Sequence, residues 1–288
     1  MVLPMTSSKK ISKLKTILIL SISSDIGLFL ARQYLSYGYK VIGTFRSSES
    51  IGSLKDQANC HLFDCDVHDA QSLKNFSRQV KQLGLKWDML ISCVGYPNPM
   101  QAFLKADFDH WQQSVEINSL DQLRALHLLY PLRNTQSIAG VVFFAGGGSN
   151  SAVVNFSAYT IGKIMLTKMC ELLDAENPDL NIFIVGPGLT KTKIHEAILK
   201  DPHVSKEKKI ATQKFMKQGQ GTSLQDIFDC IQWLSAQGKE IASGRNFSVA
   251  HDPWRSVTSK KLIKQLKLNA NSYKLRRQDN DFMQPKGK

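Results

Sequence analysis

Short apolar runs alternate along the chain with longer amphipathic stretches. The runs are rich in β-branched and aromatic residues, which is typical of buried strands. They predict strands at residues 15–20, 40–45, 60–64, 88–93, 141–144, 181–185 and 246–250. Most stretches between them have apolar residues at helical spacing. They predict helices at about 26–38, 69–83, 109–132, 224–236 and 262–268, and another that carries Tyr159 and Lys163.

Strands that alternate with helices predict a mostly parallel sheet covered on both faces. We therefore expect an α/β protein with a single Rossmann-type, doubly wound parallel sheet over residues 15–254. Residues 1–14 are expected to be a flexible basic lead-in, and residues 255–288 a basic tail. Residues 190–221 are charged and helix-prone with few core candidates, so we expect them to form a mobile cover over a site.

Polar or glycine-containing turns follow most of the predicted strands. Ligands of such sheets bind at the carboxyl ends of the strands, near the point where the strand order reverses. A helix that begins directly after the first strand also offers N–H groups to a phosphate. The sequence therefore predicts a nucleotide site in one crevice lined by Ser21–Gly27, Arg46, Asp66, Gly95, Gly146–Gly148 and Gly186–Gly188.

Tyr159 and Lys163 are four residues apart on a predicted helix, so their side chains project from one face. An ammonium near a phenol favours the phenolate, which predicts a pKa of Tyr159 below its ordinary value of about 10. Such a pair can give a proton to a carbonyl oxygen or take one from an alcohol.

Charge and cysteine usage narrow the function classes. The formal net charge is +13, and ten Lys or Arg against two Asp give +8 from Arg255 onward. This basic tail is expected to be solvated, or alternatively to attract anionic partners. No nucleic-acid motif accompanies it, so nucleic acid is set aside. No run predicts a membrane span, and the five cysteines have no metal-site spacing. They predict reduced thiols in a cytoplasmic protein without a metal.

The order of these motifs resembles the short-chain dehydrogenase/reductase family, from about residue 15 to residue 252. The resemblance implies that Tyr159 protonates the carbonyl in reduction and accepts the proton in oxidation. Lys163 would lower the pKa of Tyr159 and hold the nicotinamide ribose hydroxyls. Asn118 would anchor a proton-relaying water, or else merely bend its helix by bonding to backbone.

The resemblance also implies a cofactor site. Asp66 and Val67 would contact adenine, and the Pro187-Gly188-x-x-x-Thr192 motif would position the nicotinamide. The second strand ends in Arg46 and two serines instead of an acidic residue, which favours NADP over NAD. The full expected set is Ser21, Ser23, Ser24, Asp25, Ile26, Gly27, Arg46, Asp66, Val67, Gly95, Lys163, Pro187, Gly188 and Thr192.

The chain departs from the family at three places. The family's Asn-Asn-Ala-Gly is Ser92-Cys93-Val94-Gly95 here. In the family's Thr-Gly-x-x-x-Gly-x-Gly turn the first two glycines are Ser21 and Asp25 here. A carboxylate beside a pyrophosphate is unfavourable, so Asp25 is expected to turn away and cap the helix. The family's catalytic Ser precedes the Tyr by thirteen or fourteen residues, where this chain has Gly146 and Ala145. With Ser149 they form the expected substrate contacts; Ser149, Asn150, Ser151 or backbone N–H groups would replace the lost hydroxyl.

We therefore expect an NADP-dependent oxidoreductase that acts on the carbonyl/hydroxyl pair of a small molecule, working as a homo-dimer or tetramer. A loose likeness of Ser243–Arg245, Asp252–Trp254 and Tyr273–Arg277 to enzymes of bacterial surface-polysaccharide clusters suggests an anionic or sugar-linked substrate. One alternative is a catalytically weak NADP-binding relative that acts through protein interaction. Another is a sugar-nucleotide epimerase or dehydratase.

Overall fold

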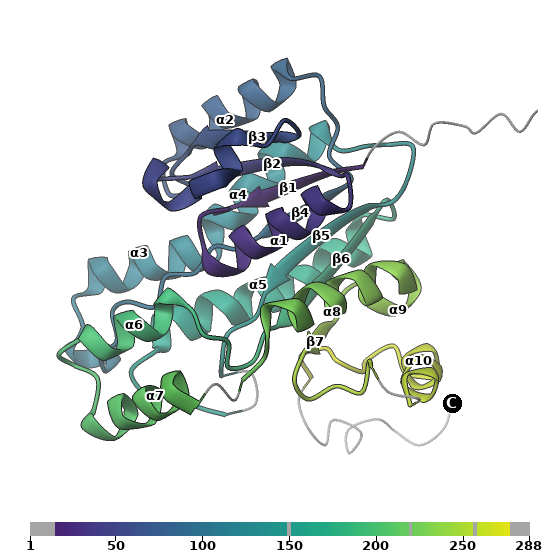
Figure 1. Cartoon of the computed structure of the whole chain (residues 1–288). Coiled ribbons are helices and arrows are strands. Elements are labelled where there is room, and N and C mark those ends of the chain that lie inside the picture. The colour runs from purple at the N-terminus through teal and green to yellow at the C-terminus, as the bar shows by residue number, and fades with distance from the viewer. Residues whose placement is uncertain (1–14, 149–150, 219–220, 256–257, 277–288) are drawn as a thin grey trace, which may run out of the picture.

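A computed structural model describes residues 15–148, 151–218, 221–255 and 258–276. Its centre is a sheet of seven strands in the order β3-β2-β1-β4-β5-β6-β7, in which all paired strands are parallel (Figure 1). The strands are β1 (Thr16–Leu20), β2 (Lys40–Phe45), β3 (Cys60–Asp64), β4 (Met89–Ser92), β5 (Ala139–Phe144), β6 (Leu180–Gly186) and β7 (Asn246–Ser248). The order reverses between β1 and β4, so the predicted doubly wound α/β fold is confirmed.

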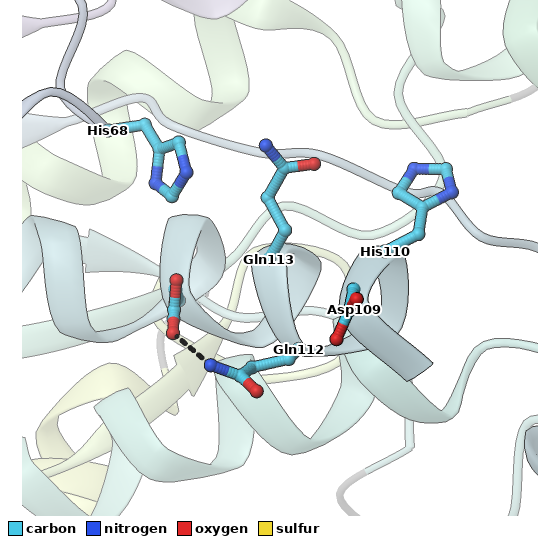
Figure 2. Close-up of a pocket in the computed structure, with 6 residues that line it drawn as sticks. His68, Asp109, His110, Gln112 and Gln113 are labelled. Carbon is cyan, nitrogen blue, oxygen red and sulfur yellow. Dashed lines mark hydrogen bonds between the residues drawn. The ribbon is translucent and has the colours of Figure 1, made fainter. Parts of the chain in front are cut away.

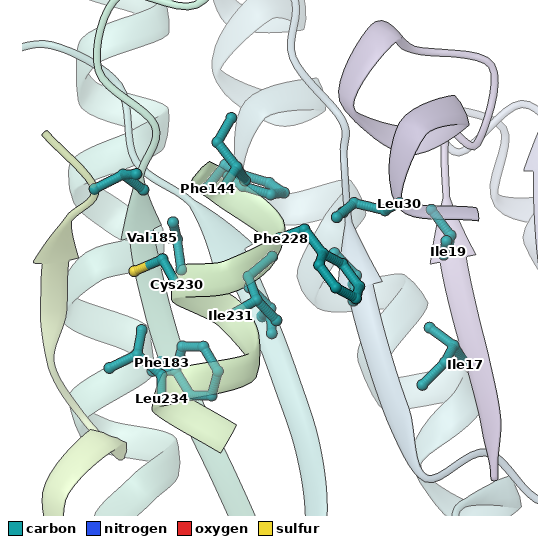
Figure 3. Close-up of a cluster of buried hydrophobic side chains, with 14 of the residues drawn as sticks. Ile17, Ile19, Leu30, Phe144, Phe183, Val185, Phe228, Cys230, Ile231 and Leu234 are labelled. Carbon is teal, nitrogen blue, oxygen red and sulfur yellow. The ribbon is translucent and has the colours of Figure 1, made fainter. Parts of the chain in front are cut away.

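Helices cover both faces of the sheet because each buried strand points alternate side chains to opposite faces. Ile17 and Ile19 of β1 belong to one apolar cluster, and Leu18 and Leu20 belong to the other. The first cluster packs under α1 (Asp25–Ser36) and α8 (Leu224–Gln237), whose Phe228 and Ile231 meet the sheet in Figure 3. The second packs under α2 (Ala70–Gln82), α4 (Leu120–Leu129) and α5 (Ser157–Glu176).

The helix expected over residues 109–132 is wrong as a single element. The structure has α3 (Phe108–Asn118), then α4, and then a 3-10 turn, η3 (Tyr130–Leu132). Ser119 separates the two α-helices with φ −142° and ψ −74°, which is not helical backbone. Two side chains compete here for backbone groups: the Ser119 hydroxyl donates to Val115 O at 2.5 Å, and the Asn118 amide bonds to the backbone of Tyr96.

Two further parts of the chain pack around this core. The segment predicted to be a lid, residues 190–221 and called the lid segment below, contains α6 (Lys193–Lys200) and α7 (Lys206–Gln218). These two helices meet through the rings of His195 and Phe215. Leu262 and Leu266 of α10 (Ser259–Leu268) are buried in the first cluster, and Arg276 forms an ion pair with Glu171. The positive segment after Arg255 is thus partly packed on the domain.

Three further short helices were not predicted from the sequence, since such short or interrupted elements show no clear helical periodicity. They are η1 (Ser48–Asp56), η2 (Phe103–Lys105) and α9 (Lys239–Ala242). Among the described residues, every helix is too short or too polar to cross a bilayer.

Candidate active site

The parallel sheet brings the predicted turns to one edge, because each of them follows the carboxyl end of a strand. Ser21 to Ser24 follow β1, Arg46 follows β2, and Asp66 and Val67 follow β3. The same edge holds Gly95 after β4, Ala145 and Gly146 after β5, and Pro187 and Gly188 after β6. The predicted crevice residues therefore share one end of the sheet.

Serines preserve the turn between β1 and α1 despite the missing glycines. Ser21 has φ +56°, a left-handed conformation that usually favours glycine. Its N–H donates to Thr44 Oγ1 at 2.9 Å, which ties the turn to β2. A side chain at Gly27 would meet Ser21 O at 2.7 Å, so glycine is required there for α1 to approach the turn.

The expectation that Asp25 caps α1 is wrong. Ser24 is the cap, because its Oγ accepts from Gly27 N at 3.1 Å. The Asp25 carboxylate instead accepts a hydrogen bond from Lys193 N, at 2.8 Å. Lys193 is the first residue of α6 in the lid segment. We call residues 21–27, between β1 and the start of α1, the phosphate turn, because the family resemblance expects the cofactor phosphates there. Its Asp25 therefore contacts the lid segment, 168 positions later in the chain.

Lys163 reaches from α5 to the end of β4. Its side chain is only 3% exposed, and Nζ donates to Val94 O at 2.8 Å. Burial lowers the pKa of Lys163 to about 8. The neighbouring Cys93 has its pKa raised to about 12 by burial, and its thiol interacts with Ser24. Cys93 thus lies between the phosphate turn and Lys163.

Tyr159 is partly buried on the same helix, with Lys163 Nζ 5.7 Å from its ring centre. Burial raises the pKa of Tyr159 to about 12, so the expected depression by Lys163 is wrong for this arrangement. The reason is geometric: the ammonium donates to Val94 O, and desolvation of the phenolate dominates. The phenol therefore stays protonated near neutral pH.

The position of the missing serine is occupied by the tyrosine ring. A Cβ at Gly146 would lie 2.4 Å from Tyr159 Cε1 and 3.1 Å from Lys163 Cγ. Ala145 is buried, and its N–H donates to Val185 O at 2.9 Å. Ser149 and Asn150 lie outside the described residues, and Ser151 is exposed. The absence of a side chain at Gly146 therefore leaves the space in which the Tyr159 ring lies.

Restoring serine at residue 146 is expected to displace Tyr159 instead of repairing the site. Both Gly146→Ser and Gly146→Ala should lower the free energy of unfolding by about 1–3 kcal/mol, the usual cost of overpacking. Urea unfolding measures this, and the pair separates the hydroxyl from the added volume. Enhanced carbonyl reduction by Gly146→Ser alone would contradict the prediction.

Asn118 joins α3 to the loop after β4. It is fully buried; Oδ1 accepts from Tyr96 N at 3.0 Å, and Nδ2 donates to Tyr96 O at 2.6 Å and Ser114 O at 2.8 Å. Helix α5 approaches closely at Gly162, where a Cβ would lie 2.6 Å from Asn118 Cβ. Asn118 therefore positions the loop beside Lys163, as the helix-bending alternative described.

The two ends of the expected cofactor site differ in how firmly they are built. The Arg46 side chain is 73% exposed, with Nη1 4.0 Å from Asp66 Oδ2. Asp66 in turn accepts from His68 N at 3.0 Å, and Val67 is buried.

At the other end Gly188 has φ +72°, and a Cβ there would lie 2.7 Å from Thr222 Oγ1. Thr192 precedes α6, with its hydroxyl 3.5 Å from His195 Nδ1.

A family model described as short chain dehydrogenase matches residues 15–203. The chain belongs to the short-chain dehydrogenase family. This confirms the resemblance stated from the motifs. A probable NADP-dependent dehydrogenase of Haemophilus influenzae is 26% identical over 249 residues, which cover 81% of this chain and 92% of that protein.

Solved structures show the same fold. A short-chain dehydrogenase/reductase from Saccharomyces cerevisiae has a TM-score of 0.76 at 21% identity, covering 83% of this chain and 97% of that one. A variant of actinorhodin polyketide ketoreductase, solved with NADPH, has a TM-score of 0.70 at 20% identity, covering 82% and 95%.

This short-chain dehydrogenase has a turn that partly fits a dinucleotide. The left-handed Ser21, the close approach at Gly27 and the exposed Arg46 suit phosphate groups near α1. Asp25 does not, because it adds a negative charge at the same helix N-terminus. Cys93, Tyr96 and the backbone of Lys193 were missed from the sequence, since their roles depend on contacts between distant segments.

A hollow on this short-chain dehydrogenase does not include Tyr159 or Lys163. It is an open surface depression of about 470 Å³ between α3 and the loop after β3. Figure 2 shows its polar lining of His68, Asp109, His110, Gln112, Gln113 and Glu116. Tyr159 and Lys163, the groups that could move a proton, are not among its lining residues.

The features that suggested a sugar-linked substrate are used for packing. Arg245 donates to Ile241 O at 2.6 Å and Leu266 O at 2.9 Å, inside the protein. Trp254 is buried, donates to Val249 O at 3.0 Å and lies 6.4 Å from the ring centre of Trp233. These residues hold the end of the domain together, so they give no evidence for a sugar.

Proposed function

We propose that the protein is an NADP-dependent oxidoreductase that interconverts a carbonyl and a hydroxyl on a small molecule. The observation that carries the proposal is the Tyr159 phenol beside the buried Lys163 amine on α5, at the edge of a doubly wound sheet where such folds bind ligands. The family supports oxidoreductase chemistry, and the printed name of the Haemophilus influenzae relative supports NADP.

In this proposal the bound nicotinamide supplies or accepts the hydride. The residues that would hold the cofactor are Ser21, Ser23, Ser24, Ile26 and Gly27 at the phosphates, with Arg46, Asp66 and Val67 at the adenosine. Gly95, Pro187, Gly188 and Thr192 would hold the nicotinamide end together with Lys163. Tyr159 donates its proton to the carbonyl oxygen in reduction, and Lys163 keeps its position beside the phenol.

We propose an anionic substrate because the lid segment is strongly basic. It carries eight lysines against Glu196, Asp201 and Glu207. Such an excess raises the local concentration of anions at a site. The lysines are Lys191, Lys193, Lys200, Lys206, Lys208, Lys209, Lys214 and Lys217.

We also propose that copies of the chain assemble as a dimer or tetramer in the cytoplasm. Helices α3, α4 and α5 leave large apolar side chains exposed, among them Phe108, Leu120, Ile161 and Leu172. Such side chains are typical of a surface that pairs with another protein.

A second candidate is a catalytically weak relative that binds NADP and acts through protein contacts. The Tyr159 ring over Gly146 favours it, because it fills the place where the family's serine hydroxyl would contact substrate. Loss of one such donor costs about 10²–10³ in rate. Turnover of carbonyl substrates by the purified protein distinguishes the two candidates.

The test is titration of the protein with NADPH and NADH, followed by fluorescence and melting temperature. Arg46→Ala should weaken NADPH about tenfold and leave NADH unchanged, because only NADPH has the 2′-phosphate that a guanidinium binds. Arg78→Ala, which removes an exposed arginine from α2, is the matched control. Binding of neither nucleotide at millimolar concentration would refute the oxidoreductase proposal.

A further inference from the structure

The Asp25 carboxylate lies at the N-termini of two helices, α1 and α6. Asp25 is the first residue of α1, and its carboxylate accepts the N–H of Lys193, the first residue of α6. The preceding Thr192 makes no side-chain cap for α6, so Asp25 satisfies an N–H group that the helix leaves open. Both helices present their positive ends, where a negative charge is stabilised.

The same location is where the family fold receives a nucleotide phosphate, at the N-terminus of the helix after the first strand. The Asp25 carboxylate and a phosphate therefore require the same kind of environment: backbone N–H groups and a positive helix end. They cannot share it without repulsion, since both are anionic. The observed contact to Lys193 N shows that the carboxylate is directed at the lid segment.

We propose that the Asp25 carboxylate latches the lid segment to the turn between β1 and α1 through Lys193 N, and that its negative charge at the same place weakens dinucleotide binding. A bound nucleotide must either displace the Asp25 carboxylate from Lys193 N or place its phosphate beside that carboxylate and be repelled by it. Asp25 thus determines nucleotide affinity and couples binding to release of α6. The inference rests on the proposed NADP-dependent function.

Asp25→Asn separates charge from hydrogen bonding, because the amide oxygen can still accept from Lys193 N. We expect Asp25→Asn to tighten NADPH on the order of tenfold at low salt, since it removes a like charge near the phosphates. The gain should shrink at 0.5 M salt, where charges are screened within a few ångströms. Asp109→Asn, an exposed carboxylate in the first turn of α3, is the matched control.

Limited trypsin digestion tests the latch without a nucleotide. Asp25→Ala loses the acceptor, so cleavage at the lysines of the lid segment should accelerate several-fold over wild type, while Asp25→Asn remains near wild type. Circular dichroism at the digestion temperature verifies that each variant is folded. Equal cleavage rates in wild type and folded Asp25→Ala would overturn the latch.

The titration distinguishes this inference from the proposed function. The inference is supported if Asp25→Asn binds NADPH more tightly than wild type while Asp109→Asn binds like wild type. It is also supported if wild type does not bind NADPH and Asp25→Asn does. Wild-type binding that Asp25→Asn leaves unchanged or weakens refutes the inference alone. No binding of NADPH or NADH by either protein at millimolar concentration refutes the proposed function, and the inference with it.

Discussion

Replacing Tyr159 with phenylalanine is expected to reduce carbonyl turnover by about 10³-fold, within the range that general acid catalysis contributes. The change removes one oxygen, and Lys163 keeps its bond to Val94 O. NADPH affinity should therefore stay within about twofold of wild type. Single-turnover oxidation of bound NADPH by a carbonyl substrate measures the chemical step separately from binding.

Tyr37→Phe is the control for this measurement, because Tyr37 is exposed at the end of α1. It should leave both rate and affinity unchanged. If Tyr159→Phe turns over as fast as wild type, the phenol is not the proton donor. If wild type binds NADPH but does not turn over carbonyl substrates, the second candidate function is favoured, in which the protein binds NADP and acts through protein contacts.

The pH profile of wild-type reduction provides a further constraint on the site. Burial holds the Tyr159 proton up to a pKa of about 12, whereas the Lys163 ammonium is lost near a pKa of about 8. The two groups therefore change charge in separate pH ranges. Of these two groups, only the amine is therefore expected to contribute to a loss of activity between pH 7 and pH 9.

The sheet could be predicted because its determinants are local. Each strand is a short apolar run such as Val141–Phe144, and each turn has its own polar or glycine residues. The break after Asn118 could not, since the helical pattern continues through it. The Asn118 amide bonds to the backbone of Tyr96 and the Ser119 hydroxyl to Val115 O, and only the folded chain places Tyr96 beside Asn118.

The candidate site has the same limit. Sequence order identified Tyr159 and Lys163 and placed Gly146 at the missing serine. It could not show that the ring lies against Gly146, or that burial outweighs the ammonium in setting the phenol pKa. The sequence also predicted the wrong partner for Asp25, because only the folded chain brings Lys193 N within hydrogen-bond distance of its carboxylate. Local pattern therefore identifies the candidate reacting groups, and long-range packing determines their burial and surroundings.

Lys163→Met is expected to change how stability depends on pH as well as to reduce turnover by about 10²-fold. Burial lowers the pKa of Lys163 from its ordinary 10.5 to about 8 in the folded protein. Between these values the unfolded chain holds the proton and the folded chain has lost it, so the stability from this group rises with pH. Below about pH 8 both states are protonated, and the fold bears the full cost of a buried charge.

Urea unfolding of wild type and Lys163→Met at pH 7.5 and pH 9.5 measures this difference. Wild type should gain about 2 kcal/mol relative to the variant over that interval, from the linkage between a shifted pKa and stability. The buried cysteines, whose pKa values are raised by burial, also titrate unequally, but they are common to both proteins and cancel in the difference. Parallel pH dependence would mean that Lys163 is not held in a desolvated site. A gain of about this size by wild type between pH 7.5 and pH 9.5 would support a desolvated, destabilising ammonium at Lys163.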